Sequence, residues 1–201
     1  PALQSAPQFL SRRNLTQMPT CCAQWFYNLV LLPLLRLAVR VKARKDCKLR
    51  EGLERRREVW KRLGNSLGDR DWQKPLLWFH VASAGELLQA QPVIFRCVAE
   101  GWQCVLTYSS INALRWVERL GGVPEVLAVD FLPEDTSFNV RRLLGLIQPS
   151  GIVHVSYDLW PNLIWEAQRQ GIPQGLISAL VHAGSAREAK GVGRALYRSL
   201  Y

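Results

Sequence analysis

The feature that most constrains the fold of this chain is a regular alternation of short apolar runs with longer amphipathic segments after residue 75. The apolar runs have strand length and no helical period, and they are Leu76–Val81, Cys104–Tyr108, Val126–Val129, Gly151–Val155 and Gln174–Ile177. The segments between them predict helices at Glu86–Glu100, Asn112–Leu120, Ser137–Ile147 and Asn162–Gln170. This alternation predicts an α/β fold, a Rossmann-like parallel sheet with helices on both faces.

The part of the chain before this alternation is organised differently. With 201 residues, the chain has room for one substantial core and an appendage. The only methionine is Met18, so we interpret residues 1–24 as a leader or an appended segment. Residues 25–74 then form an apolar anchor and a basic helical linker, and residues 75–201 form the Rossmann-like domain.

The apolar run Trp25–Leu35 contains Pro33 and is followed by Arg36 and Arg40. About a dozen apolar residues are fewer than the ~20 that a transmembrane helix needs, so the run predicts a monotopic anchor at the membrane interface. Two alternatives remain open, namely a buried core helix and a signal or spanning segment. The positive charges follow the run and no AxA-like cleavage site appears, which disfavours a signal peptide.

The positive charge of the chain is concentrated in one stretch. The net charge is +10, and residues 36–70 hold 13 Lys or Arg against 5 Asp or Glu. Next to an apolar anchor, such a stretch favours an anionic membrane surface as its partner. The alternative is a solvated helical face with a weak apolar stripe at Leu53, Val59, Trp60 and Leu63. A nucleic-acid binder is less favoured, because no recognition motif accompanies the basic residues.

The five cysteines form neither a CxxC pair nor a zinc-like spacing with histidines, which favours a reducing, cytoplasmic setting. Ligands of parallel α/β sheets bind at the carboxyl ends of the strands. The residues at these ends are mostly small or polar: Ser83–Glu86, Ser109 and Ser110, Asp130–Asp135, Ser156–Asn162, and Ser178 onward. Hydroxyls, carboxylates and amides in these positions suit a polyhydroxylated substrate.

Glu86 is the candidate catalytic base of this sequence. It opens a predicted helix directly after Gly85, a residue that allows close approach to the backbone, and the helix N-terminus stabilises the ionised form of its carboxyl group. The alternative is a first-turn acid favoured only by the helix dipole. The sequence around it is not a phosphate loop, since Gly85 is its only glycine. This half therefore presents an acceptor more plausibly than a nucleotide.

Three motifs in collinear order resemble the 3-deoxy-D-manno-octulosonic acid (Kdo) transferase family: WFHVASAGE at 78–86, FLPED at 131–135 and DLWPNLI at 158–164. The resemblance runs from about Tyr27 to the last residue. It implies the N-terminal half of a GT-B glycosyltransferase, which binds a lipid A precursor. The donor CMP-Kdo is bound by a C-terminal domain that this chain lacks.

The resemblance also implies a reaction and a site. Glu86 removes a proton from the acceptor hydroxyl in an inverting transfer that needs neither a metal nor a cofactor. Together with the apolar run and the basic stretch, the resemblance leads us to expect a monotopic enzyme at the cytoplasmic face of the inner membrane. We also expect these 201 residues to be inactive without the donor domain. The expected acceptor-binding residues are Ser83, Gly85, Ser109, Ser110, Asp158, Trp160, Asn162 and Ser185. Trp160 and Trp165 either stack on sugar or pack against the sheet.

The sequence departs from the family pattern in two places. Ser156 and Asp158 stand where two glutamates are usual, and residues 178–182 read SALVH instead of an NARLS run. His182 is either a substitute polar contact or a structural residue. The arginine of the NARLS run is absent from this sequence. Its loss is compatible with an altered acceptor, a divergent lineage or an inactive copy. Two alternative functions therefore remain: a GT-B glycosyltransferase with another lipid-linked acceptor, and a non-catalytic membrane-bound interaction domain.

Overall fold

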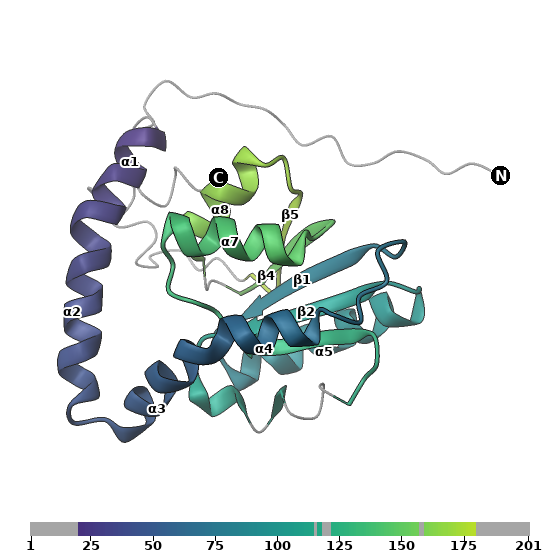
Figure 1. The fold of residues 1–201 in the computed structure, drawn as a ribbon, viewed down its shortest axis with the longest axis horizontal. Coiled ribbons are helices and arrows are strands. Elements are labelled where there is room, and N and C mark those ends of the chain that lie inside the picture. The colour runs from purple at the N-terminus through teal and green to yellow at the C-terminus, as the bar shows by residue number, and fades with distance from the viewer. Residues whose placement is uncertain (1–19, 115, 118–121, 157–158, 180–201) are drawn as a thin grey trace.

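The computed structural model describes residues 20–114, 116–117, 122–156 and 159–179. Its centre is a five-stranded sheet with all neighbouring strands parallel, in the order β3-β2-β1-β4-β5 (Figure 1). The strands are β1 (Leu76–Val81), β2 (Gln103–Tyr108), β3 (Val126–Phe131), β4 (Gly151–Val155) and β5 (Gln174–Ile177). The predicted α/β, Rossmann-like fold is confirmed.

Helices cover both faces of this sheet. One face packs against α5 (Ala84–Ala99) and the short 3-10 turn η3 (Ile111–Ala113), and the other packs against α4 (Val59–Ser66), α7 (Ser137–Ile147) and α8 (Pro161–Arg169). The strand order reverses at β1, whose neighbours are β2 and β4. Such a reversal opens a crevice at the carboxyl ends of the central strands, where ligands of this fold bind. The segment after β1 contains Glu86.

Capping residues in the sequence define where these helices begin and end. The side chains of Ser83 and Thr136 cap α5 and α7 by accepting hydrogen bonds from backbone N–H groups of the first turn. Pro161 occupies the first turn of α8, where its missing N–H is not needed. Gly101 and Gly171 follow α5 and α8 with φ of 85° and 68°, a conformation that favours glycine.

A continuous helical segment precedes the sheet domain and runs along one side of it (Figure 1). It consists of α1 (Thr20–Phe26), a π-helical turn η1 (Tyr27–Leu31) and α2 (Leu32–Ala43). In the π turn the Leu32 N–H donates to the Tyr27 carbonyl, five residues back. This wider turn lies directly before Pro33, which has no N–H to donate, so the helix continues through the proline.

The length argument for this segment is corrected by the structure. The helix Cys22–Ala43 has 22 residues and contains an 18-residue window with a mean hydropathy of 1.4, so by length and composition it is able to cross a membrane. The prediction of a monotopic anchor counts only the apolar run Trp25–Leu35, whereas the helix continues past Arg36 and Arg40 to Ala43. Ala23, Tyr27 and Leu32 nevertheless pack on Ile164 and Trp165 of α8.

The basic segment after this helix is part of the folded body. It forms α3 (Cys47–Arg55), a 3-10 turn η2 (Arg56–Glu58) and α4. Val59 and Leu63 are fully buried in the core on the α7 side of the sheet. Both carboxylate oxygens of Asp130 in β3 accept hydrogen bonds of 2.7 Å from Arg62. Residues 59–66 therefore belong to the domain that was expected to begin at residue 75.

Candidate functional site

Glu86 lies in the first turn of α5, directly beyond the end of β1. Its backbone N–H donates to the Ser83 hydroxyl at 3.4 Å, and its carboxylate accepts a hydrogen bond from the Ala82 N–H. The pair resembles a capping box, in which a serine and a glutamate three residues later satisfy the free N–H groups of a helix start. Glu86 thus has a structural role at the position where the sequence predicts a catalytic base.

Ser109 lies beside this turn. Its backbone N–H donates to the Val81 carbonyl at 3.1 Å. That carbonyl belongs to the same peptide unit as the Ala82 N–H that binds Glu86. Because the two groups of a trans peptide point in opposite directions, Ser109 and Glu86 hold this peptide from opposite sides. The structure thus brings together the ends of β1 and β2, with Ser83, Ser109 and Glu86 around one peptide.

A buried histidine links Ser109 to the sheet interior. His80 is fully buried; its Nδ1 lies 2.8 Å from the Thr107 hydroxyl and its Nε2 lies 3.2 Å from the Ser109 hydroxyl. The indole of Trp78 only donates, and it donates to the same Thr107 oxygen at 2.8 Å. Two His80 tautomers satisfy this network. In one, Thr107 donates to Nδ1 and Nε2–H donates to Ser109; in the other, Nδ1–H donates to Thr107, Thr107 donates to the Phe79 carbonyl at 3.5 Å, and Ser109 donates to Nε2. Sequence reasoning missed His80 because it is a strand residue.

Arg56 is a second residue that sequence reasoning missed at this edge of the sheet. Its Nη2 donates to the Ser109 carbonyl at 2.6 Å and its Nε donates to the Leu132 carbonyl at 3.2 Å. The guanidinium also lies over the Phe131 ring, 5.1 Å from its centroid. One member of the basic stretch is thus fixed at the ends of β2 and β3. No signal in the sequence separates it from its basic neighbours.

The ends of β4 and β5 carry two strained serines. Ser156 and Ser178 both have φ of 56°, in the left-handed region that non-glycine residues rarely adopt. The Ser156 hydroxyl donates to Gln89 of α5 at 3.1 Å, which places it beside the helix of Glu86. Strain of this kind persists where surrounding structure enforces it and is common near functional sites.

Two of the three motifs meet in space around Asp135. Its carboxylate accepts hydrogen bonds of 3.1 Å from the N–H groups of Asn162 and Leu163 and one of 2.9 Å from the Tyr27 hydroxyl. Asp135 is fully buried, and this burial raises its pKa to about 6, although the three hydrogen bonds oppose the shift. The FLPED motif thus caps the helix that begins in the WPN motif, and both attach to the N-terminal helix.

Asn162 has a structural role in this arrangement. It is fully buried, and its amide exchanges hydrogen bonds of 2.9 and 3.0 Å with the amide of Asn28. It also donates to the Asp135 carbonyl at 2.6 Å and accepts from Ser137 at 3.0 Å. The prediction that Asn162 contacts the acceptor does not fit this burial, because every polar atom of its side chain is used within the protein.

The other predicted site residues differ in what they contact. Ser110 caps the η3 turn through Asn112 N at 3.3 Å, and a side chain at Gly85 would meet only Ser83 Oγ, at 3.9 Å. Trp160 is half-buried and lies edge-on to His80, with 6.0 Å between ring centroids. Asp158, His182 and Ser185 lie outside the described residues.

Trp165 packs rather than lining the strand ends. It is 1% exposed and makes an edge-to-face contact with Tyr27 at 5.8 Å between ring centroids. Among the described residues, Cys47, Cys97 and Cys104 are free thiols. Within the same part of the chain, no three His, Cys, Asp or Glu side chains gather as metal ligands. The strand-end site is therefore built from serines, one glutamate and aromatic rings.

Comparison with known proteins assigns this arrangement to a family. The profile of the 3-deoxy-D-manno-octulosonic-acid transferase (kdotransferase) family matches residues 54–201. The chain belongs to this family. The matched region begins in α3 and includes the complete sheet and the turn that holds Glu86.

Relatives with this name occur in bacteria and a plant. The chain is 33% identical over 127 residues to 3-deoxy-D-manno-octulosonic acid transferase of Bordetella pertussis, covering 62% of this chain and 30% of that protein. It is 35% identical over 106 residues to a probable mitochondrial transferase of Arabidopsis thaliana, covering 52% and 23%. It is 30% identical over 118 residues to the Chlamydia pneumoniae transferase, covering 58% and 27%. The chain thus corresponds to less than a third of each relative.

A solved structure of UDP-GlcNAc 2-epimerase from Neisseria meningitidis also superposes on part of the fold. The TM-score is 0.43 at 19% identity, covering 63% of this chain and 38% of that one. A likeness this weak adds nothing to the sheet topology described above.

Proposed function

We propose that this chain supplies the acceptor-binding half and the catalytic base of an enzyme that transfers Kdo from CMP-Kdo to a lipid A precursor. The observation that carries the proposal is the position of Glu86. It belongs to a chain of the Kdo transferase family and lies in the turn after β1, at the reversal of the strand order where ligands of such sheets bind.

In the proposed reaction, Glu86 accepts the proton of the acceptor hydroxyl as its oxygen attacks the anomeric carbon of Kdo. A new glycosidic bond forms, the bond from Kdo to CMP breaks, and CMP leaves with the bonding electron pair. The Ala82 N–H fixes the carboxylate for this role, and the hydroxyls of Ser83 and Ser109 offer hydrogen bonds to the acceptor. Asp158, Trp160 and Ser185 remain proposed acceptor contacts.

The donor is proposed to bind a second domain outside this chain. The Bordetella pertussis relative is matched over only 30% of its length, which leaves room for such a domain. We therefore expect no transfer by these 201 residues alone. A second candidate is a related transferase with another lipid-linked acceptor. It is favoured by Ser156, which lies beside α5 and stands where the family pattern has a glutamate.

Hydrogen exchange tests the assignment of this half to the acceptor. In the full-length protein, a lipid A precursor is expected to slow exchange at the amides of residues 82–86 and 109–110 and around Asp158. CMP alone is expected to leave these amides unchanged, because the nucleotide binds the other half. Protection of the same amides by CMP and not by the lipid would reverse the assignment of the two halves.

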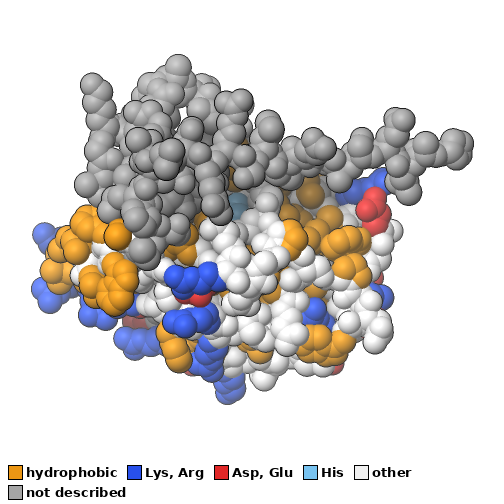
Figure 2. All heavy atoms as spheres, turned by 90° about the horizontal axis from the view of Figure 1, so that it is seen from above, with side chains coloured by type: hydrophobic (Ala, Val, Ile, Leu, Met, Phe, Trp, Pro, Cys, Tyr) orange, Lys and Arg blue, Asp and Glu red, His pale blue; other side chains and the backbone are white. Residues whose placement is uncertain are grey.

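The N-terminal helix is proposed to hold the enzyme at the cytoplasmic face of the inner membrane without crossing it. Its exposed apolar side chains include Trp25, Leu29, Leu34, Leu35, Leu37 and Val41. In Figure 2 apolar side chains gather over this helix, at the left, with Lys and Arg around them. Tyr27 and Arg36 attach the helix to Asp135 and Glu134, which supports an orientation along the domain.

Vesicle sedimentation tests this attachment. The full-length protein is expected to sediment with anionic vesicles and to be partly released by high salt, because salt screens the basic residues and leaves apolar insertion intact. Vesicles of neutral lipid serve as the control and are expected to bind less protein. Equal binding to both kinds of vesicle would exclude the basic stretch as a lipid contact.

A further inference from the structure

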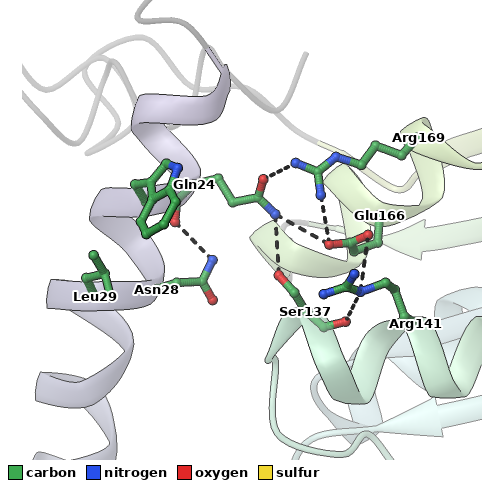
Figure 3. A pocket seen from close by; sticks show the side chains of 8 residues that line it. Gln24, Asn28, Leu29, Ser137, Arg141, Glu166 and Arg169 are labelled. Atoms are coloured by element: carbon green, nitrogen blue, oxygen red, sulfur yellow. Dashed lines mark hydrogen bonds and ion pairs between the residues drawn. The ribbon is translucent and has the colours of Figure 1, made fainter.

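An open pocket of about 400 Å³ lies between the N-terminal helix and the helices α7 and α8 (Figure 3). The residues that line it come from these three elements and are Gln24, Trp25, Asn28, Leu29, Ser137, Arg141, Glu166 and Arg169. None of them lies in the turns after β1 or β2, which hold Glu86 and Ser109. The pocket therefore shares no lining residue with the proposed acceptor site.

The polar wall of this pocket carries a net positive charge. Glu166 is buried at 2% exposure and accepts a hydrogen bond of 3.0 Å from Arg169, while the Nε of Arg141 lies 3.9 Å from its other oxygen. Arg169 also donates to Gln24, which fixes the helix α1 against α8. Two guanidinium groups thus share one carboxylate, and one positive charge remains uncompensated within the pocket.

Arg141 is the arginine that is able to bind a further anion. Its Nε donates to the Ser137 carbonyl at 3.1 Å, and its side chain is 62% exposed. Within the described part of the chain, the two terminal nitrogens of Arg141 have no hydrogen-bond partner. A guanidinium presents these N–H groups as a planar fork that matches the oxygens of a phosphate.

The wall formed by the N-terminal helix carries two apolar side chains, Trp25 and Leu29, beside the amides of Gln24 and Asn28. Trp25 and Leu29 are 66% and 64% exposed and lie on the same continuous helix as the other exposed apolar side chains. Tryptophan is enriched where protein meets the headgroup layer of a membrane. A pocket with a phosphate donor at Arg141 and apolar side chains at Trp25 and Leu29 fits an anionic lipid better than it fits a soluble phosphate.

We propose that this pocket binds the phosphate of an anionic phospholipid, with Arg141 as its main donor and the acyl chains along Trp25 and Leu29. The proposal rests on the proposed membrane attachment of the N-terminal helix and adds a defined headgroup site to it. The bound lipid bridges the helix and α7, so it also fastens the helix to the domain at the membrane surface.

Titration of a soluble short-chain lipid tests the pocket without a bilayer. Dihexanoyl phosphatidylglycerol, kept below its micellar concentration, is expected to bind the full-length protein with one saturable site in calorimetry. Arg141→Gln is expected to weaken this binding about fivefold or more, the loss of one charge contact to an anionic lipid. Among the described residues, the hydrogen bond and the ion pair of Arg141 go to Ser137 and Glu166 and not to the N-terminal helix, so the variant is expected to leave the helix in place.

The matched control is Arg96→Gln, which removes the same charge from α5 on the opposite face of the sheet, where Arg96 is 78% exposed. It is expected to change the affinity less than twofold. Equal weakening by both variants would overturn the site, and so would equal binding of dihexanoyl phosphatidylcholine. Binding of glycerol 1-phosphate as tight as that of the lipid would overturn the assignment to a lipid.

Sedimentation with anionic vesicles separates this proposal from the membrane attachment on which it rests. If the protein sediments with vesicles but does not bind the short-chain phosphatidylglycerol, the headgroup site is wrong and the attachment stands. If it does neither, both are wrong. Saturable lipid binding that depends on Arg141, together with sedimentation, supports both.

Discussion

Asp135→Ala is expected to lower the free energy of unfolding by about 3 kcal/mol or more. The alanine leaves the N–H groups of Asn162 and Leu163 and the hydroxyl of Tyr27 buried without an acceptor, and each such group costs ~1–3 kcal/mol. Urea unfolding followed by circular dichroism measures the change. A loss below about 1 kcal/mol would show that Asp135 does not hold α8 and the N-terminal helix together.

The conservative variant Asp135→Asn keeps an acceptor oxygen and removes the ionisation. Burial raises the pKa of Asp135 to about 6, so its contribution to stability is fully present below pH 3.8 and is lost as the pH rises through 6. We expect the stability of the wild type relative to Asp135→Asn to fall between pH 4 and pH 7, by on the order of 3 kcal/mol. A difference that stays constant over this range would contradict the raised pKa.

Glu86→Gln in the full-length enzyme is expected to reduce Kdo transfer by about 10²- to 10⁴-fold, the usual effect of losing a positioned base. Glutamine has the size of glutamate but does not accept the proton of the acceptor hydroxyl. The fold should change little, because glutamine also serves at this position of a capping box and still accepts the Ala82 N–H bond. Incorporation of labelled Kdo into the lipid measures the effect.

Asp158→Asn is the matched comparison for this variant. Its carboxylate lies in the motif that departs from the family pattern, and we expect it to orient the acceptor rather than to remove the proton. The variant should therefore weaken transfer less than Glu86→Gln does. If the order of the two effects is reversed, Asp158 becomes the candidate base.

The strands and helices of the sheet domain were predictable from the sequence because their patterns are local. β1, β4, β5 and α7 have the predicted bounds, and β2 and β3 differ only by one or two residues at an end. Ser83, Ser109 and Glu86 were predictable as strand-end residues, because the carboxyl ends of parallel strands meet at one edge of the sheet. This prediction needed only the strand pattern and the fold class.

The parts of the site that depend on tertiary contacts were not predictable. Asn162 follows a strand and is polar, which indicates a ligand contact, yet its partners Asn28 and Asp135 come from distant segments. The charges around α4 concealed its burial, and Arg36 and Arg40 concealed the length of the N-terminal helix. His80 and Arg56 are positioned at the site by hydrogen bonds to Ser109, which lies in a different segment of the chain from either residue.

Single-turnover transfer by Glu86→Gln tests the central claim most directly, because it separates the chemical step from binding. The full-length variant is saturated with a lipid A precursor, mixed with CMP-Kdo, and compared with the wild type under the same conditions. Our account predicts nearly unchanged acceptor binding and a transfer rate reduced by at least about a hundredfold. A variant that binds the acceptor and retains more than about a tenth of the wild-type rate would show that Glu86 is not the base.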